Sequence, residues 1–231
     1  MQLLAPLNIF SALDGIAVLL LISFWLLIGW RIEHPAEHRP SVSKIMARYR
    51  QAWMQQMITR QPRIFDAQTI ATLRQGTAFF ASTAVIAIGG ALALLGNAEG
   101  LITVTAQLTR QDQSSFMVEL KLLLIVFFLT NAFLKFVWAN RLFGYCSVVM
   151  AAVPNDPQDP DASSMARQAA DLNVTAARSF NRGLRSVYFG LASVSWLGGP
   201  VLLITASTLT VVVIWRREFA SQSRQILLEP R

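Results

Sequence analysis

Residues 119–141 read ELKLLLIVFFLTNAFLKFVWANR, and this stretch decides the fold of the chain. Positions 120–139 supply about the twenty mostly apolar residues that an α-helix needs to cross the hydrocarbon core of a bilayer. Three comparable apolar runs occur elsewhere in the sequence. We therefore predict an all-α, polytopic membrane protein, a single membrane domain over 1–231 with four transmembrane helices at about 15–30, 76–95, 120–139 and 186–215.

The composition agrees with a membrane protein. Hydrophobic residues make up 54% of the 231 residues and charged residues only 14%, against about 25% charged in an average soluble domain. The formal net charge is +7, but the bases flank the apolar runs instead of forming a Lys/Arg tract mixed with aromatics, so we expect no nucleic-acid partner. The single cysteine, Cys146, excludes an intramolecular disulfide and a thiolate cluster built from this chain alone.

Lys and Arg residues are concentrated between the first and second apolar runs and again between the third and fourth. Because such loops stay on the cytoplasmic side, we predict a multi-pass protein of the cell (inner) membrane with its N-terminus outside. Two amphipathic helical regions, 43–75 and 163–180, are expected at the inner face, with Ser43 as the N-cap of the first. At the outer face, Ser11 and Asp14 resemble a capping box that opens the first helix.

The last apolar run, 186–215, is longer than one crossing requires and contains Gly198-Gly199-Pro200 in its middle. It is either one long, kinked helix or a helical hairpin that turns at these three residues. We favour the single helix, because two halves of about fifteen residues are each short for a crossing. That choice places Arg216, Arg217 and Arg224 outside, whereas a hairpin would place them inside.

Small residues recur along the second apolar run, including the pairs Ala78/Ser82 and Gly89/Ala93. Such small-xxx-small spacings let helix backbones approach closely in lipid. The pattern serves packing within one chain and dimerisation alike, and we favour packing within the chain.

The sharpest polar candidate is Lys135, which lies inside the third apolar run. Its side chain either extends to the inner headgroups, forms an ion pair with Asp66 or Asp171, or lines a polar cavity. The residues proposed for a polar path or a buried ion pair are Asn131, Lys135, Asn140, Arg141 and Asp66.

A set of inner-face arginines is a second candidate site, for an anionic lipid or an acidic partner: Arg60, Arg63, Arg178, Arg182 and Arg185. Two histidines and two glutamates fall together in 33–38, but Pro35 and Pro40 favour a loop there. Helical spacing of metal ligands is therefore unsupported, and we expect neither a metal site nor a cofactor.

Four strings occur in order along the chain: Trp53-Met54 with RQPRIFD at 60–66, FFAST at 79–83, KFVW at 135–138, and FNRGLR at 180–185 followed by Tyr188-Phe189. Together they resemble the domain of unknown function 599 family, multi-span membrane proteins of bacteria and plants. The resemblance implies a membrane location and four spans with inner-face helices. It supplies no activity and no catalytic residues.

No histidine lies near a nucleophile in the sequence, and no phosphate-binding loop or nucleophile elbow occurs. We therefore expect no enzyme activity. The leading hypothesis is a non-catalytic accessory or scaffold protein that packs against itself or another membrane complex, with anionic lipids at its inner face. The alternative is an oligomeric channel or transporter for an ion or small anion.

Overall fold

The structure of the protein, a computed structural model, describes residues 11–97, 100 and 114–229. This part of the chain is helical and contains no strand. Its elements are α1 Ala12–Glu33, α2 Val42–Met57, α3 Ile64–Gly96, α5 Ser115–Ala152, α6 Ala162–Val194, the 3-10 helix η2 Ser195–Gly198, α7 Pro200–Phe219 and α8 Gln222–Leu228. Four segments in it are long and apolar enough to cross a membrane: Ala12–Glu33, Ile64–Gly96, Ser115–Ala152 and Pro200–Leu228. The prediction of an all-helical membrane protein with four such helices is confirmed.

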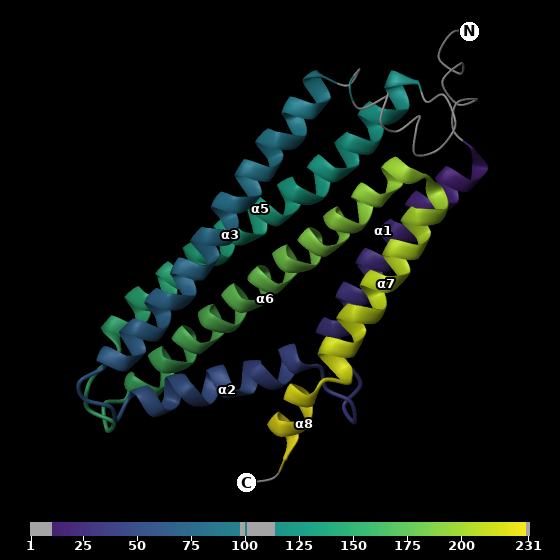
Figure 1. Cartoon of the computed structure of the whole chain (residues 1–231). Coiled ribbons are helices and arrows are strands. Elements are labelled where there is room, and N and C mark those ends of the chain that lie inside the picture. Colours follow the sequence, from purple (N-terminus) through teal and green to yellow (C-terminus); the bar gives the residue numbers. More distant parts are fainter. Residues whose placement is uncertain (1–10, 98–99, 101–113, 230–231) are drawn as a thin grey trace, which may run out of the picture.

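Figure 1 shows α3, α5 and α6 as long rods side by side, with α6 between α5 and the pair formed by α1 and α7. Helix α2 crosses one end of this bundle, where α8 also lies. We call this end the α2 end, and the end that carries η2 the hairpin end. Helix α6 belongs to both main cores, because Ala169 packs with α2 and α5 while Phe189 packs with α1 and α7.

The first helix begins as the sequence predicts. Ser11 is the N-cap of α1, and its hydroxyl accepts a hydrogen bond from Asp14 N at 3.1 Å and donates one to Asp14 Oδ2 at 2.6 Å. Asp14 also accepts a hydrogen bond from Trp196 Nε1 at 2.7 Å and is buried. Asp14 therefore ties the start of α1 to η2 at the hairpin end.

The single-helix prediction for 186–215 is wrong. The run turns back at Gly198-Gly199-Pro200, and α7 returns along α1 (Figure 1). Gly199 has φ +112°, a conformation that favours glycine, and Pro200 starts α7 because its missing N–H needs no partner there. The halves are not too short after all: α6 has 33 residues and α7 has 20, about 50 and 30 Å at helical rise.

Three helix boundaries also differ from the predictions. Helix α2 is capped by Ser41, whose hydroxyl accepts from Lys44 N at 3.2 Å, and not by Ser43. The inner-face piece that ends at 75 continues into the second span as one helix, α3, and 163–180 continues as α6. Helix α6 runs through Gly183, where the missing side chain makes room for Phe136 of α5: an added Cβ would lie 2.6 Å from the Phe136 ring.

Candidate functional site: a basic cavity between α2 and α6

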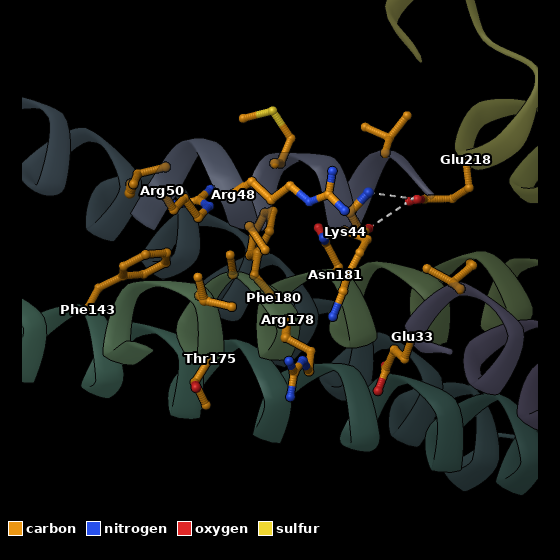
Figure 2. A pocket seen from close by; sticks show the side chains of 18 of the residues that line it. Glu33, Lys44, Arg48, Arg50, Phe143, Thr175, Arg178, Phe180, Asn181 and Glu218 are labelled. Carbon is orange, nitrogen blue, oxygen red and sulfur yellow. Dashed lines mark hydrogen bonds between the residues drawn. The ribbon is translucent and has the colours of Figure 1, made fainter. Parts of the chain in front are cut away.

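A cavity of about 790 Å³ lies at the α2 end, between α2 and α6. Side chains of α3, α5 and α7 complete its walls. Figure 2 shows Lys44, Arg48 and Arg50 on the α2 side and Thr175, Arg178 and Phe180 on the α6 side. Apolar residues line it as well, among them Leu73, Phe143, Val174, Ala177 and Phe180. The cavity therefore combines a basic wall with an apolar one.

Helix α2 presents its bases to the cavity because its other face is fixed. Ser41 is fully buried, and its hydroxyl donates to Ile32 O at 2.8 Å, which ties the start of α2 to the end of α1. Ile45 and Met54 are buried on the bundle side of α2. Lys44 and Arg48, one helical turn apart, are exposed and line the cavity.

Helix α6 supplies the opposite wall. Asp171, Thr175 and Arg178 succeed one another along one face of α6, at spacings of three and four residues. Within the described residues, the side chains of Lys44, Arg48 and Arg178 enter no salt bridge and no hydrogen bond. The cavity thus holds three cations that have no partner of their own in the described structure.

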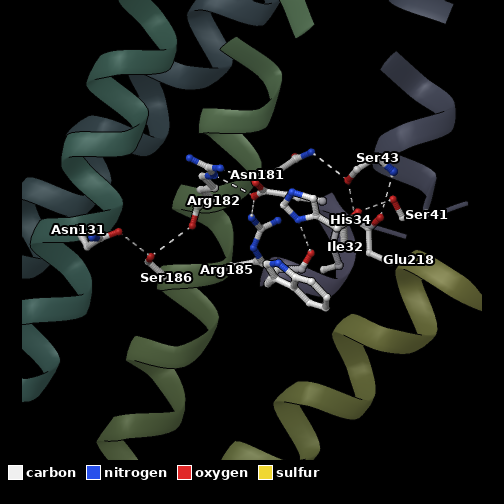
Figure 3. A network of polar contacts seen from close by, with 12 residues as sticks. Ile32, His34, Ser41, Ser43, Asn131, Asn181, Arg182, Arg185, Ser186 and Glu218 are labelled. Carbon is white, nitrogen blue, oxygen red and sulfur yellow. Dashed lines mark hydrogen bonds and ion pairs between the residues drawn. The ribbon is translucent and has the colours of Figure 1, made fainter. Parts of the chain in front are cut away.

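Two of the acids at the cavity already have partners. Glu33 pairs with Arg182 and, at 2.7 Å, with Arg185. Glu218 accepts hydrogen bonds from Ser43 N and Ser43 Oγ, both at 3.0 Å, and joins α7 to α2 (Figure 3). Asp171 is exposed and forms no salt bridge with a described residue.

Arg50 is anchored more deeply. Its guanidinium donates to Asn173 Oδ1, and Asn173 Nδ2 lies 3.7 Å from the buried Cys146 sulfur. Burial lowers the pKa of Arg50 from its ordinary value. Because that value lies far above neutral pH, the side chain keeps its charge. Arg50 therefore adds positive charge at one end of the cavity.

The structure does not bring the residues proposed for a polar path into one place. Asn131 accepts from Ser186 Oγ at 3.0 Å, between α5 and α6, whereas Asn140 donates to Arg74 O at 2.9 Å, between α5 and α3. The guanidinium of Arg141 contacts Tyr145 on its own helix. The side chain of Lys135 is partly buried, and within the described residues it forms no salt bridge.

Asp66 is fully buried at the corner between α2 and α3, where it pairs with Arg60 and accepts from Trp53 Nε1 at 2.6 Å. Arg63 donates to Val153 O at 2.7 Å and Pro154 O at 2.8 Å, beyond the end of α5. Of the five predicted inner-face arginines, four thus serve contacts within the chain: Arg60, Arg63, Arg182 and Arg185. Arg178 lies in the cavity.

Lys44 and Arg48 are not among the site residues predicted from the sequence, where they belong to the bases between the first and second apolar runs. Their signal was the amphipathic pattern of α2, which predicts a polar face but not which other helix that face meets.

His34 of the proline-rich loop stacks on Trp30, with ring centroids 5.5 Å apart. The described residues contain no group of three or more His, Cys, Asp or Glu that could hold a metal.

Comparison with known families gives one match: the family described as "Protein of unknown function, DUF599" covers residues 16–223. The chain belongs to the DUF599 family. The comparisons found no similar protein among curated proteins and no similar fold among solved structures.

In this DUF599 protein, three of the four strings that carried the resemblance meet in one place. Phe80, Phe136 and Phe180 come from three different strings, and their ring centroids lie 5.4 to 5.5 Å apart. They sit on α3, α5 and α6, next to Gly183. The remaining string, from Trp53 to Asp66, forms the corner between α2 and α3. Residues of these four strings therefore form contacts between helices, at the corner between α2 and α3 and among α3, α5 and α6.

Proposed function

We propose that this DUF599 protein is a non-catalytic membrane scaffold or accessory protein that packs against a second copy or against another membrane protein. The main support for the proposal is the exposed face of α3, which does not pack against α5. Among the described helices, α3 packs mainly against α5, through buried residues such as Thr77, Ala84 and Ala91. Most of the rest of this apolar helix is exposed.

The exposed part of α3 contains the small residues noted in the sequence. Ala78, Ser82, Gly89 and Ala93 fall on one side of the helix and are all exposed. A Cβ added at Gly89 or at the neighbouring Gly90 would meet nothing within 4 Å in the described structure. Packing among the described residues does not use these four positions, so they remain open to close approach by another helix.

The orientation follows from the hairpin. Most described bases lie toward the α2 end (Figure 1). They belong to α2, to the ends of α5 and α6 near their connection, and to α7 and α8. The hairpin end carries Lys121 near the start of α5. The positive-inside rule then supports a cytoplasmic α2 end and an N-terminus outside, and Arg216, Arg217 and Arg224 no longer conflict with it.

A conduit for a small anion is the second candidate, favoured by the basic cavity. The cavity includes Phe180, and the neighbouring Phe80 and Phe136 pack against it. The three rings pack together beside the cavity, with centroids 5.4 to 5.5 Å apart, and this packing supports the scaffold over the conduit. Anion flux into liposomes that depends on the protein and falls in Arg48→Ala or Arg178→Ala, both of which line the cavity, would reverse this preference.

Disulfide crosslinking in native membranes tests the scaffold. The protein offers a clean background because its one cysteine, Cys146, is fully buried. We expect Ser82→Cys and Ala93→Cys to give covalent dimers under mild oxidation if the partner is a second copy. Ala87→Cys and Leu94→Cys, exposed on the other flank of α3, serve as matched controls.

Purification in a gentle detergent tests the other case, in which the partner is a different membrane protein. A foreign membrane protein that copurifies in fixed ratio, and is lost in Gly89→Leu, supports an accessory role. If the experiments give neither covalent dimers nor a copurifying membrane protein, the scaffold proposal is ruled out.

A further inference from the structure

We infer that the cavity between α2 and α6 binds a phosphate-bearing anion, with Lys44, Arg48 and Arg178 as its cationic ligands. At about 790 Å³ the cavity lies within the range of about 300 to 1,000 Å³ typical of small-molecule sites. The inference goes beyond the scaffold role and does not depend on it. Only the choice of a lipid as the source of the phosphate rests on the proposed orientation.

The charge of the cavity points to an anion. Glu33 is paired with Arg182 and Arg185, whereas Glu218, which accepts hydrogen bonds from the neutral Ser43, keeps its negative charge. The lining nevertheless has more bases than acids, because the acids Glu33, Asp171 and Glu218 stand against Lys44, Arg48, Arg50, Arg178, Arg185 and Arg217. Like charges that face one cavity repel each other, and a bound anion relieves this repulsion.

The residue types point to phosphate. An arginine donates two parallel hydrogen bonds to a phosphate, and a lysine adds a point charge. Arg48 lines the cavity from α2 and Arg178 lines it from α6 (Figure 2), so both helices contribute a guanidinium group to its walls. Thr175 and Asn181 are further polar side chains of the lining.

The apolar wall points to a lipid as the source. Leu73, Gly76 and Thr77 of α3 line the cavity, and α3 continues from them into its lipid-facing part. A phospholipid could place its phosphate between Arg48 and Arg178 and its acyl chains along α3. Basic pockets between helices on the cytoplasmic side of membrane proteins bind anionic headgroups in this way. A soluble phosphate compound would use the same cations without the apolar wall.

The test uses the purified full chain in a gentle detergent. Bound lipid is counted by native mass spectrometry after addition of phosphatidylglycerol, with zwitterionic phosphatidylcholine as the comparison. In parallel, the rise in unfolding temperature is measured with phosphatidylglycerol or inorganic phosphate, because a ligand that binds only the folded state stabilises it.

Arg178→Ala and Arg48→Ala should each weaken binding about tenfold, as expected for loss of a charge-assisted hydrogen bond. Arg167→Ala is the matched control, because Arg167 lies on the same helix as Arg178, is exposed and does not line the cavity. Asp171→Asn should tighten binding, since it removes the opposing charge. All these side chains are exposed or partly exposed, so the variants are expected to fold.

Phosphatidylglycerol binding that weakens in Arg48→Ala and Arg178→Ala, but not in Arg167→Ala, supports the site with a lipid as its ligand. The same pattern with inorganic phosphate alone supports the site with a soluble phosphate. Equal weakening in Arg167→Ala, or no binding of either probe, overturns the inference. The crosslinking experiment on α3 tests the scaffold proposal independently. A negative result in the phosphate-binding experiment therefore does not affect the scaffold proposal.

Discussion

At the scale of single residues, Asp66 is the group on which the corner between α2 and α3 depends. It is fully buried and accepts hydrogen bonds from Trp53 of α2 and from Arg60 of the connection between the two helices. A buried carboxylate is tolerated only when it is paired in this way. Three residues of one short sequence string are thus held together by one acid.

Replacing Asp66 should lower the free energy of unfolding. Asp66→Ala leaves the N–H of the partly buried Trp53 without its acceptor, which we expect to cost about 1–3 kcal/mol. Asp66→Asn keeps an acceptor for Trp53 and should cost less. Arg60→Gln should also lower the free energy of unfolding, because it leaves the charge of the fully buried Asp66 without its cationic partner, although Arg60 itself is 37% exposed. Thermal unfolding in detergent measures the order, and an Asp66→Ala protein as stable as the wild type would contradict this role.

At the scale of helices, the contact between α5 and α6 is set by a glycine. Phe136 is fully buried and its ring lies over Gly183. The ring cannot move aside easily, because Phe80 and Phe180 pack against it. Gly183 therefore lets the Phe136 ring of α5 pack directly on the backbone of α6.

Gly183→Ala tests this contact. Alanine normally favours a helix over glycine by up to about 1 kcal/mol, but the added Cβ would overlap the Phe136 ring. Overpacking of this kind costs about 1–3 kcal/mol, so we expect a net loss of stability. Gly144→Ala is the matched control on α5: its Cβ would lie 3.9 Å from the nearest atom, and we expect an unchanged or slightly higher unfolding temperature. Equal behaviour of the two variants would refute the contact.

The helices also show which parts of the fold could be predicted from the sequence. Apolar runs of helical length predict α1, α3 and α5, because lipid imposes that length on a crossing helix. The hairpin was the alternative that we did not favour, because the first half of α6 is amphipathic and does not extend the apolar run. The cavity and the pairing of Glu33 with Arg182 and Arg185 could not be predicted, since these residues lie far apart in the sequence and meet only through the packing of α6.

At the scale of the whole molecule, the hairpin fixes which end each loop occupies. The connection between α5 and α6 and the C-terminal α8 share the α2 end, whereas the start of α5 lies at the hairpin end (Figure 1). A single helix over the last apolar run would have separated α8 from that connection. The two arrangements therefore differ in a property that can be measured in cells.

Thiol accessibility distinguishes them. Ser164→Cys and Ser223→Cys, both exposed at the α2 end, should be labelled by a membrane-impermeant maleimide from the same side of the membrane. Ser115→Cys, exposed at the start of α5, should be labelled from the other side. The wild type, whose Cys146 is buried, gives the background. Labelling of Ser223→Cys together with Ser115→Cys would contradict the hairpin.

The polarity of α6 bears on how the protein is made. Helix α6 runs beside α5 but is not among the helices apolar enough to enter lipid by themselves. The translocon sorts segments by hydrophobicity, so α6 alone would not partition out of it during synthesis. Apolar α7 follows directly after the turn at Gly199. We therefore expect α6 and α7 to insert as a unit against α5, and a ribosome stalled before α7 to leave α6 outside the bilayer.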